Sequence, residues 1–164
     1  MISSIRLDER MIHGQVAIKW SRHLNIDRII VVSDMAAANT VVQKSLMMAA
    51  PPTAKVAIKS VEDSLPLIND PRMENHKLMI IVSTPEDLLT VAKNVAGANM
   101  INVGNYGRIA PKKDNEARKT YQPNLYLYPD EVDILKEVIA TGIQCNYQTV
   151  PDHAPQELGR VLGS

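Results

Sequence analysis

The residues best placed for chemistry lie in one short run near the amino terminus. Residues 6–16 read RLDERMIHGQV, so His13 follows Arg10 by three residues and stands directly before a predicted helix. An imidazole is a nucleophile near neutral pH and can carry a phosphoryl group. The guanidinium of Arg10 and free N–H groups at a helix start can neutralise the phosphoryl oxygens. The run therefore predicts phosphoryl transfer through His13.

The neighbours of His13 have further parts in this interpretation. The backbone N–H groups of Gly14, Gln15 and Val16 belong to the first turn of the helix and are free to bind an anion. Asp8 can either orient the imidazole through its second nitrogen or hold Arg10 in place. The alternative is structural: a histidine at a helix start can be a cap, and the charged residues around it can form a solvated loop.

The elements that position this run alternate between strand and helix. Residues from Ile2 to Asp8 form the first strand, and Gly14–Leu24 forms a helix with Val16, Trp20 and Leu24 on one face. Further strands are predicted at 28–33, 54–59, 77–83, 99–103, 121–128 and 143–149, and further helices at 34–50, 60–68, 84–97, 129–142 and 154–162. This order predicts one α/β domain over residues 1–164, an open, mostly parallel twisted sheet with helices on both faces.

Polar residues recur where the predicted strands end. Ligands bind such sheets outside the carboxyl ends of the strands, which form one rim. Besides the loop from Asp8 to His13, the rim candidates are Ser33, Asp34, Thr84, Gly104 and Asn105. The segment from Gly104 to Gly107 lacks the lysine and hydroxyl residue of a Walker loop.

Composition excludes several classes of protein. The formal net charge is zero, so general binding to nucleic acid is not favoured. A single cysteine, Cys145, leaves no disulfide framework, and no pair of histidines has metal-ligand spacing. We expect no metal, no cofactor and no targeting or membrane-spanning segment, hence a cytoplasmic protein. The basic stretch from Arg108 to Lys119 is either a solvated loop or a local patch of unassigned role.

Residues 6–16, followed by Trp20, resemble the active-site signature of the IIB component of the mannose/fructose/sorbose class of bacterial sugar phosphotransferase systems. The resemblance continues at residues 29–34, 49–52, 83–87, 101–105, 142–143 and 150–151, in the family's order. The residues after Gly104 and the segment 114–128 fit the family less well.

The resemblance implies a phosphocarrier of about seven strands with His13 on the loop after the first. His13 would accept a phosphoryl group from a phosphohistidine of the IIA component, at Nδ1, and pass it to a sugar held by the membrane IIC and IID components. Arg10 would stabilise charge. The carrier would meet the inner face of the membrane only transiently, and self-association is compatible with the sequence. His13 must meet two partners in turn, so we expect an open rim around it.

Two other classes of function compete with a phosphocarrier. One is a non-catalytic regulatory domain of the same fold that binds a small anion at the rim. The other is a nucleotide-binding enzyme, which the missing glycine-rich phosphate loop disfavours. The density of charged residues around His13 favours the phosphocarrier.

Overall fold

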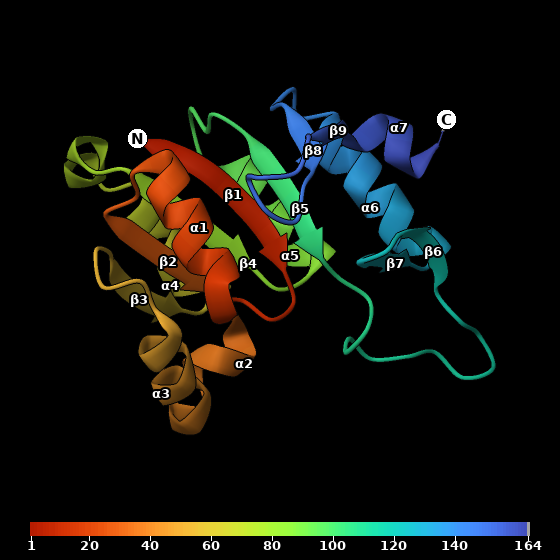
Figure 1. Ribbon diagram of the computed structural model, residues 1–164, viewed down its shortest axis with the longest axis horizontal. Helices are drawn as coiled ribbons and strands as arrows, with labels where there is room; N and C mark the ends of the chain where they lie inside the picture. The colour runs from red at the N-terminus through yellow and green to blue at the C-terminus, as the bar shows by residue number, and fades with distance from the viewer. Residues whose placement is uncertain (164) are drawn as a thin grey trace.

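The computed structural model describes residues 1–163, and their centre is a seven-stranded sheet in the order β3-β2-β4-β1-β5-β8-β9 (Figure 1). All neighbours pair in parallel except β8 and β9. The strands are β1 (Ile2–Asp8), β2 (Arg28–Val32), β3 (Lys55–Lys59), β4 (Leu78–Val82), β5 (Ile101–Asn105), β8 (Cys145–Tyr147) and β9 (Gln156–Glu157). The expected α/β class and mostly parallel sheet are confirmed.

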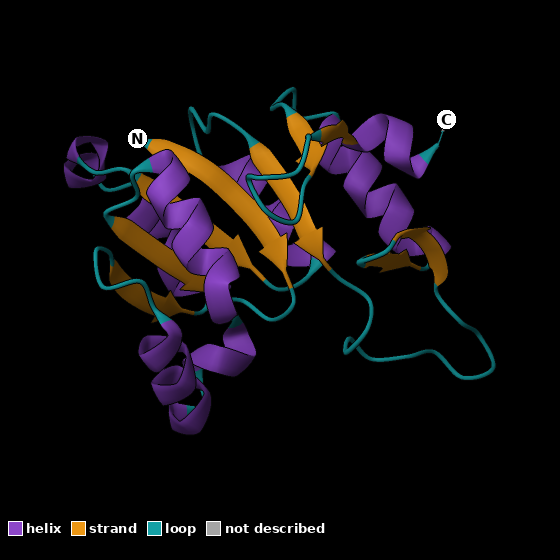
Figure 2. Cartoon of the chain, viewed as in Figure 1, coloured by secondary structure: helices purple, strands orange, loops and turns teal. Residues whose placement is uncertain are grey.

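Helices cover both faces of the sheet (Figure 2). They are α1 (Gly14–Leu24), α2 (Asp34–Ala37), α3 (Thr40–Ala49), α4 (Val61–Ile68), α5 (Pro85–Asn94), α6 (Pro129–Ile139) and α7 (Leu158–Leu162), with a 3-10 turn at Pro71–Asn75. One apolar core joins the sheet to α4, α5, α6 and α7, and a second joins it to α1 and α3. Two buried faces explain the continuous apolar runs of β2 and β4.

The first strand contributes differently to the two cores. Ile5 and Leu7 are fully buried in the larger core. Arg6 and Asp8 alternate with them and therefore point to the face covered by α1. This face of β1 is polar but buried, and it ends at the loop that carries His13.

The segment after β2 forms two helices where the sequence predicts one. The Ser33 hydroxyl, not Asp34, caps α2 by accepting the Ala36 N–H at 3.2 Å. The chain then leaves the helix, and Asn39 Oδ1 caps α3 by accepting the N–H groups of Val41 and Val42. A second good capping residue inside the predicted helix is the physical reason for the break.

The predicted strand at 121–128 is also wrong. The structure contains an antiparallel hairpin instead, β6 (Lys119–Gln122) and β7 (Leu125–Leu127), separate from the main sheet. Pro123 lies in its turn, where no ladder N–H is required.

Several boundaries move as well, among them those of β5, α5, α6 and β8. β5 includes Gly104 and Asn105, which the sequence assigns to a loop. α5 ends at Asn94 rather than at Gly97. The last helix begins at Leu158 because Gln156 and Glu157 pair with β8. Among residues 1–163, no helix has the length and apolar character needed to cross a membrane.

Candidate functional site

Asp8, the last residue of β1, is the centre of the site. It is fully buried and collects donors from three segments of the chain. Its Oδ2 contacts His13 Nε2 at 3.0 Å, Asn105 Nδ2 at 3.1 Å and Arg6 Nη2 at 3.2 Å, and its Oδ1 accepts the Arg10 N–H at 3.0 Å. Burial alone would raise the pKa of Asp8. The hydrogen bond from His13 and the charge of Arg6 outweigh burial and place this pKa below its ordinary value.

The contact with Asp8 defines which nitrogen of His13 is available. An ionised carboxylate only accepts hydrogen bonds, so Nε2 carries the proton and Nδ1 keeps its lone pair. The His13 side chain is 24% exposed, so the imidazole is reachable from solvent. The expectation of an open rim agrees with this exposure.

The backbone around His13 is held in a specific shape. His13 is extended and occupies the capping position of α1, but its side chain caps no N–H group there. The first-turn N–H groups of Gly14, Gln15 and Val16 are therefore left without a side-chain acceptor from His13. Gly14 has φ of +46°, which favours glycine for its conformation as well as for its small size.

Arg10 is exposed, and it is connected to the site through its backbone. Asp8 contacts the His13 imidazole and accepts the Arg10 N–H, so it makes a contact relevant to each of the two roles that the sequence leaves open. Within residues 1–163, no ion pair involves the Arg10 guanidinium. The predicted charge-stabilising group thus lies on the same loop as His13 with its cation uncompensated.

The other rim candidates divide into two groups. Ser33 and Thr84 cap α2 and α5, and Asp34 accepts the Val61 N–H at 2.9 Å. These three hold helices in place. Asn105 joins the cluster at Asp8, and Gly104 lies against Arg6, where an added Cβ would be 2.1 Å from Nη2. Only Gly104 and Asn105 are brought into the Asp8 cluster.

Arg6 is the site residue that sequence reasoning missed. It is 2% exposed, and its guanidinium bonds Asp8, the Asn102 side chain and the carbonyls of Gln148 and Thr149. It also lies 5.5 Å from the centre of the Trp20 ring. The available signal was strand alternation, which places residues 6 and 8 on one face. Trp20 in turn donates its indole N–H to Thr149 O at 3.0 Å.

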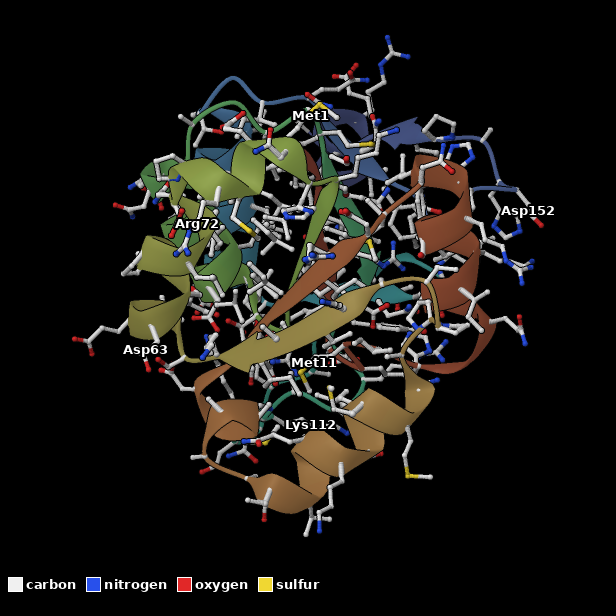
Figure 3. All side chains as sticks on the ribbon, turned by 90° about the vertical axis from the view of Figure 1, so that its left-hand side faces the viewer. Met1, Met11, Asp63, Arg72, Lys112 and Asp152 are labelled. Atoms are coloured by element: carbon white, nitrogen blue, oxygen red, sulfur yellow. The ribbon has the colours of Figure 1, made fainter. Side chains whose placement is uncertain are left out.

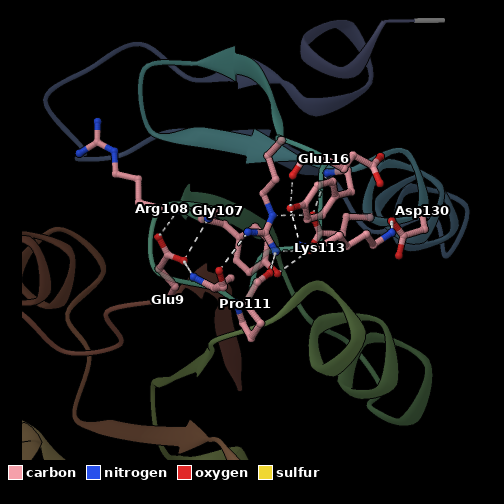
Figure 4. Close-up of polar contacts among 12 residues, drawn as sticks. Glu9, Gly107, Arg108, Pro111, Lys113, Glu116 and Asp130 are labelled. Carbon is pink, nitrogen blue, oxygen red and sulfur yellow. Dashed lines mark hydrogen bonds and ion pairs between the residues drawn. The ribbon is translucent and has the colours of Figure 1, made fainter.

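Glu9 has a separate structural role that the sequence did not indicate. Its Oε1 accepts the N–H groups of Gly107, Ile109 and Ala110 at 3.0, 3.3 and 3.2 Å, and its Oε2 accepts that of Arg108 at 3.0 Å (Figure 4). We call residues 107–118 the arm. The buried Glu9 carboxylate fixes the root of the arm to the loop that carries His13.

The far end of the arm is fixed to α6. Arg118 Nε donates to Glu131 Oε1 at 2.9 Å, and both side chains are 6% exposed. Burial alone would raise the pKa of Glu131, but the hydrogen bonds from Arg118 and the Tyr106 hydroxyl lower it below the ordinary value. Tyr128 adds a bond by accepting the Lys113 N–H at 2.8 Å. The arm is thus attached at both ends (Figure 4).

Within residues 1–163, the other histidines and the single cysteine make no hydrogen bond to Asp8 or His13. His76 contacts Asp27 at 2.9 Å, His153 contacts Thr149 at 3.2 Å, and His23 packs edge-on against Trp20. Burial raises the pKa of the Cys145 thiol to about 11, which suits a core residue rather than a nucleophile. Residues 1–163 contain no group of three or more histidine, cysteine or acidic side chains arranged to hold a metal ion.

Comparison with known proteins assigns this arrangement to a family. A family model described as the PTS system sorbose subfamily IIB component matches residues 2–164. The chain belongs to this family. A probable phosphotransferase enzyme IIB component from Streptococcus pyogenes serotype M6 is 40% identical over 163 residues, covering 99% of each chain. The mannose-specific EIIAB component of Escherichia coli K12 is 35% identical over 152 residues, covering 92% of this chain and 45% of that one.

The fold agrees with the family assignment. The IIB domain of the sorbose permease from Klebsiella pneumoniae superposes with a TM-score of 0.87 and 24% identity, covering 98% of this chain and 95% of the other. The protein is a sorbose-type PTS IIB component, a phosphocarrier of the sugar phosphotransferase system and hence a phosphotransferase. The family match favours this function over the regulatory and nucleotide-binding alternatives.

Proposed function

We propose that the chain acts as a single IIB domain in which His13 carries the phosphoryl group. The observation that supports this most directly is the 3.0 Å contact of Nε2 with Asp8, which leaves Nδ1 as the free nucleophile. The donor is a phosphohistidine of a IIA component, either separate or linked as in the mannose-specific EIIAB relative. The acceptor is a sugar held by membrane IIC and IID components, which this protein meets at the cytoplasmic face.

The first transfer needs little covalent chemistry from the protein. The Nδ1 lone pair of His13 attacks phosphorus, and the bond from phosphorus to the donor nitrogen breaks with its electron pair returning to the donor ring. Asp8 keeps the proton on Nε2 and stabilises the positive charge that the imidazole gains. Arg10 and the N–H groups of Gly14, Gln15 and Val16 neutralise the phosphoryl oxygens.

The second transfer reverses these roles. A sugar hydroxyl oxygen attacks phosphorus and its proton passes to solvent water. The bond from phosphorus to Nδ1 breaks, and its electron pair returns to the imidazole ring. The imidazole leaves as a neutral ring, still bonded to Asp8 through Nε2. Asp8 and Asn105 share one hydrogen-bonded cluster, so the ring keeps its orientation between the two transfers.

The test is label transfer from phosphoenolpyruvate through the general transfer proteins and a matched IIA component. We expect one acid-labile phosphoryl group on the wild-type chain and none on His13→Ala. NMR of the phosphorylated protein should place phosphorus on Nδ1. Label on His13→Ala, or phosphorus on Nε2, would contradict the proposal.

A further inference from the structure

The loop between β8 and β9 encloses a small hollow together with the turn of the β6–β7 hairpin. The loop crosses the face of the sheet beside α1 (Figure 1), and its Asp152 lies next to α1 in the side view (Figure 3). The hollow has a volume of about 230 Å³. This is less than a drug-sized ligand needs, so the hollow suits one small molecule.

The lining of the hollow is polar but uncharged. Among residues 1–163, those that line it include no carboxylate, ammonium or guanidinium group. Its side-chain amides and hydroxyls come from Gln122, Asn124, Gln148, Gln156, Tyr147 and Thr149. The amides of Gln122 and Gln156 make no hydrogen bond within residues 1–163. Burial raises the pKa of Tyr147, so its hydroxyl keeps its proton.

Charged side chains close to the lining are bound to other groups. Asp152 pairs with Lys19 at 3.0 Å, and Glu157 lies 3.8 Å from Arg160. Arg108 donates to a carbonyl of the hairpin turn at 2.8 Å. The lining itself therefore offers an ionised ligand no counter-charge, and a phosphate group would lose its hydration there without gaining a cation.

We propose that the hollow is an accessory binding site for an uncharged, hydroxyl-rich molecule of the size of one monosaccharide. Each hydroxyl of such a molecule both donates and accepts hydrogen bonds, and a side-chain amide supplies both partners. Pro123 and Ala154 add apolar surface for its C–H groups. The site is separate from the phosphoryl chemistry, so the binding proposal does not depend on the role of His13.

The loop that lines the hollow is bonded to the cluster around His13. Arg6 donates to Gln148 O at 3.1 Å and to Thr149 O at 3.0 Å, and the same guanidinium bonds Asp8, the partner of His13. A molecule in the hollow contacts the two residues whose carbonyls hold Arg6. We therefore expect occupancy to change the rate of transfer through His13, an effect that rests on the function proposed for His13.

Binding is measured by NMR titration of the full chain. Glucose, mannose, fructose, sorbose and mannitol are added up to about 100 mM, and the phosphate ester of any probe that binds is the charged counterpart. We expect at least one uncharged probe to shift the backbone amides of Gln148 and Thr149 saturably, with half-saturation at about 1–10 mM. The phosphate ester should bind about tenfold more weakly or not at all.

A double variant and a matched control locate the binding. Gln122→Ala combined with Gln156→Ala should raise the half-saturating concentration about tenfold or more, because two free amides of the lining are lost. Gln144→Ala removes an exposed amide outside the hollow and should leave it unchanged. The proposal is overturned if no probe gives a saturable shift, if the double variant binds as well as wild type, or if the phosphate ester binds equally.

A second measurement tests the link to His13. Single-turnover transfer from purified phosphorylated IIA is followed with and without the bound probe, in the absence of membrane components, so that no acceptor reaction contributes. We expect the wild-type rate constant to change about fivefold and that of the double variant to stay the same. Equal wild-type rates with and without the probe overturn the link. The label on His13→Ala tests the role of His13 separately.

Discussion

At the residue scale, the side chains from Arg6 to His13 have different roles according to whether they point into the protein or toward solvent. Arg6 and Asp8 point from β1 into the buried face under α1, whereas Arg10 is exposed and His13 is partly exposed. The sequence indicated the chemistry of His13 and Arg10 because the chemistry of an exposed side chain follows from its residue type and does not depend on its tertiary contacts. It did not indicate the bonds of Arg6 or Glu9, because these depend on segments about a hundred or more residues away.

Arg10 should affect transfer and leave stability unchanged. Its guanidinium is exposed and, within residues 1–163, belongs to no ion pair, so Arg10→Ala removes no structural contact of that group. We expect transfer to and from His13 to slow about 10³-fold, the lower range for arginines in phosphoryl transfer. Single-turnover rates and thermal unfolding check this. A rate within a few fold of wild type would exclude Arg10 from the mechanism.

Arg6, in contrast to Arg10, should contribute mainly to the stability of the fold. Arg6→Met leaves the buried Asp8 carboxylate without its cation and two carbonyls without a donor. Removing one partner of a buried pair costs about 3–5 kcal/mol, so the midpoint of urea unfolding should fall sharply. The exposed pair of Lys19 with Asp152 is the control, because Lys19→Met should change stability by less than about 1 kcal/mol. Equal effects of the two variants would contradict this account.

At the element scale, the strands with two buried faces were the easiest to predict. Their continuous apolar runs are set by burial in both cores, and β2 and β4 end within a residue or so of expectation. The hairpin at 119–127 and the arm could not be predicted in the same way. Their shape comes from single tertiary bonds, such as those of Glu9, rather than from a periodic pattern.

The Glu9 carboxylate should determine the order of the arm. Glu9→Gln keeps one carbonyl oxygen and adds an NH₂ group that cannot accept the backbone N–H groups now bound there. We expect hydrogen exchange of the amides of residues 107–110 to accelerate about tenfold or more, with exchange in the central strands unchanged. Asp130→Asn, which removes only the exposed pair with Lys113, should leave these amides protected. Protection that persists in Glu9→Gln would show that the arm is held by other contacts.

At the scale of the whole molecule, two buried carboxylates join the segments that lie at the carboxyl ends of the strands. Asp8 joins β1, β5 and the His13 loop, and Glu131 joins the arm, α6 and Tyr106. Both have a pKa below the ordinary value, because their donors outweigh the effect of burial. The chemistry of the rim and the stability of the fold therefore depend on the same two ionised carboxylates.

This arrangement predicts how stability changes with pH. For Glu131, the folded pKa lies below the unfolded pKa, so its stabilisation is present above the unfolded value and is lost as pH falls through the folded one. The side chain of Glu131→Gln cannot titrate. The free energy of unfolding of this variant should fall below that of the wild type by the largest amount near pH 7, and the difference should become smaller below about pH 4.5. Urea unfolding at pH 7, 5 and 3.5 measures this deficit. Asp133→Asn, an exposed change on the same helix, should show no deficit at any of these values. If the deficit in the free energy of unfolding of Glu131→Gln stays constant down to pH 3.5, the interaction of Arg118 with residue 131 does not require an ionised carboxylate.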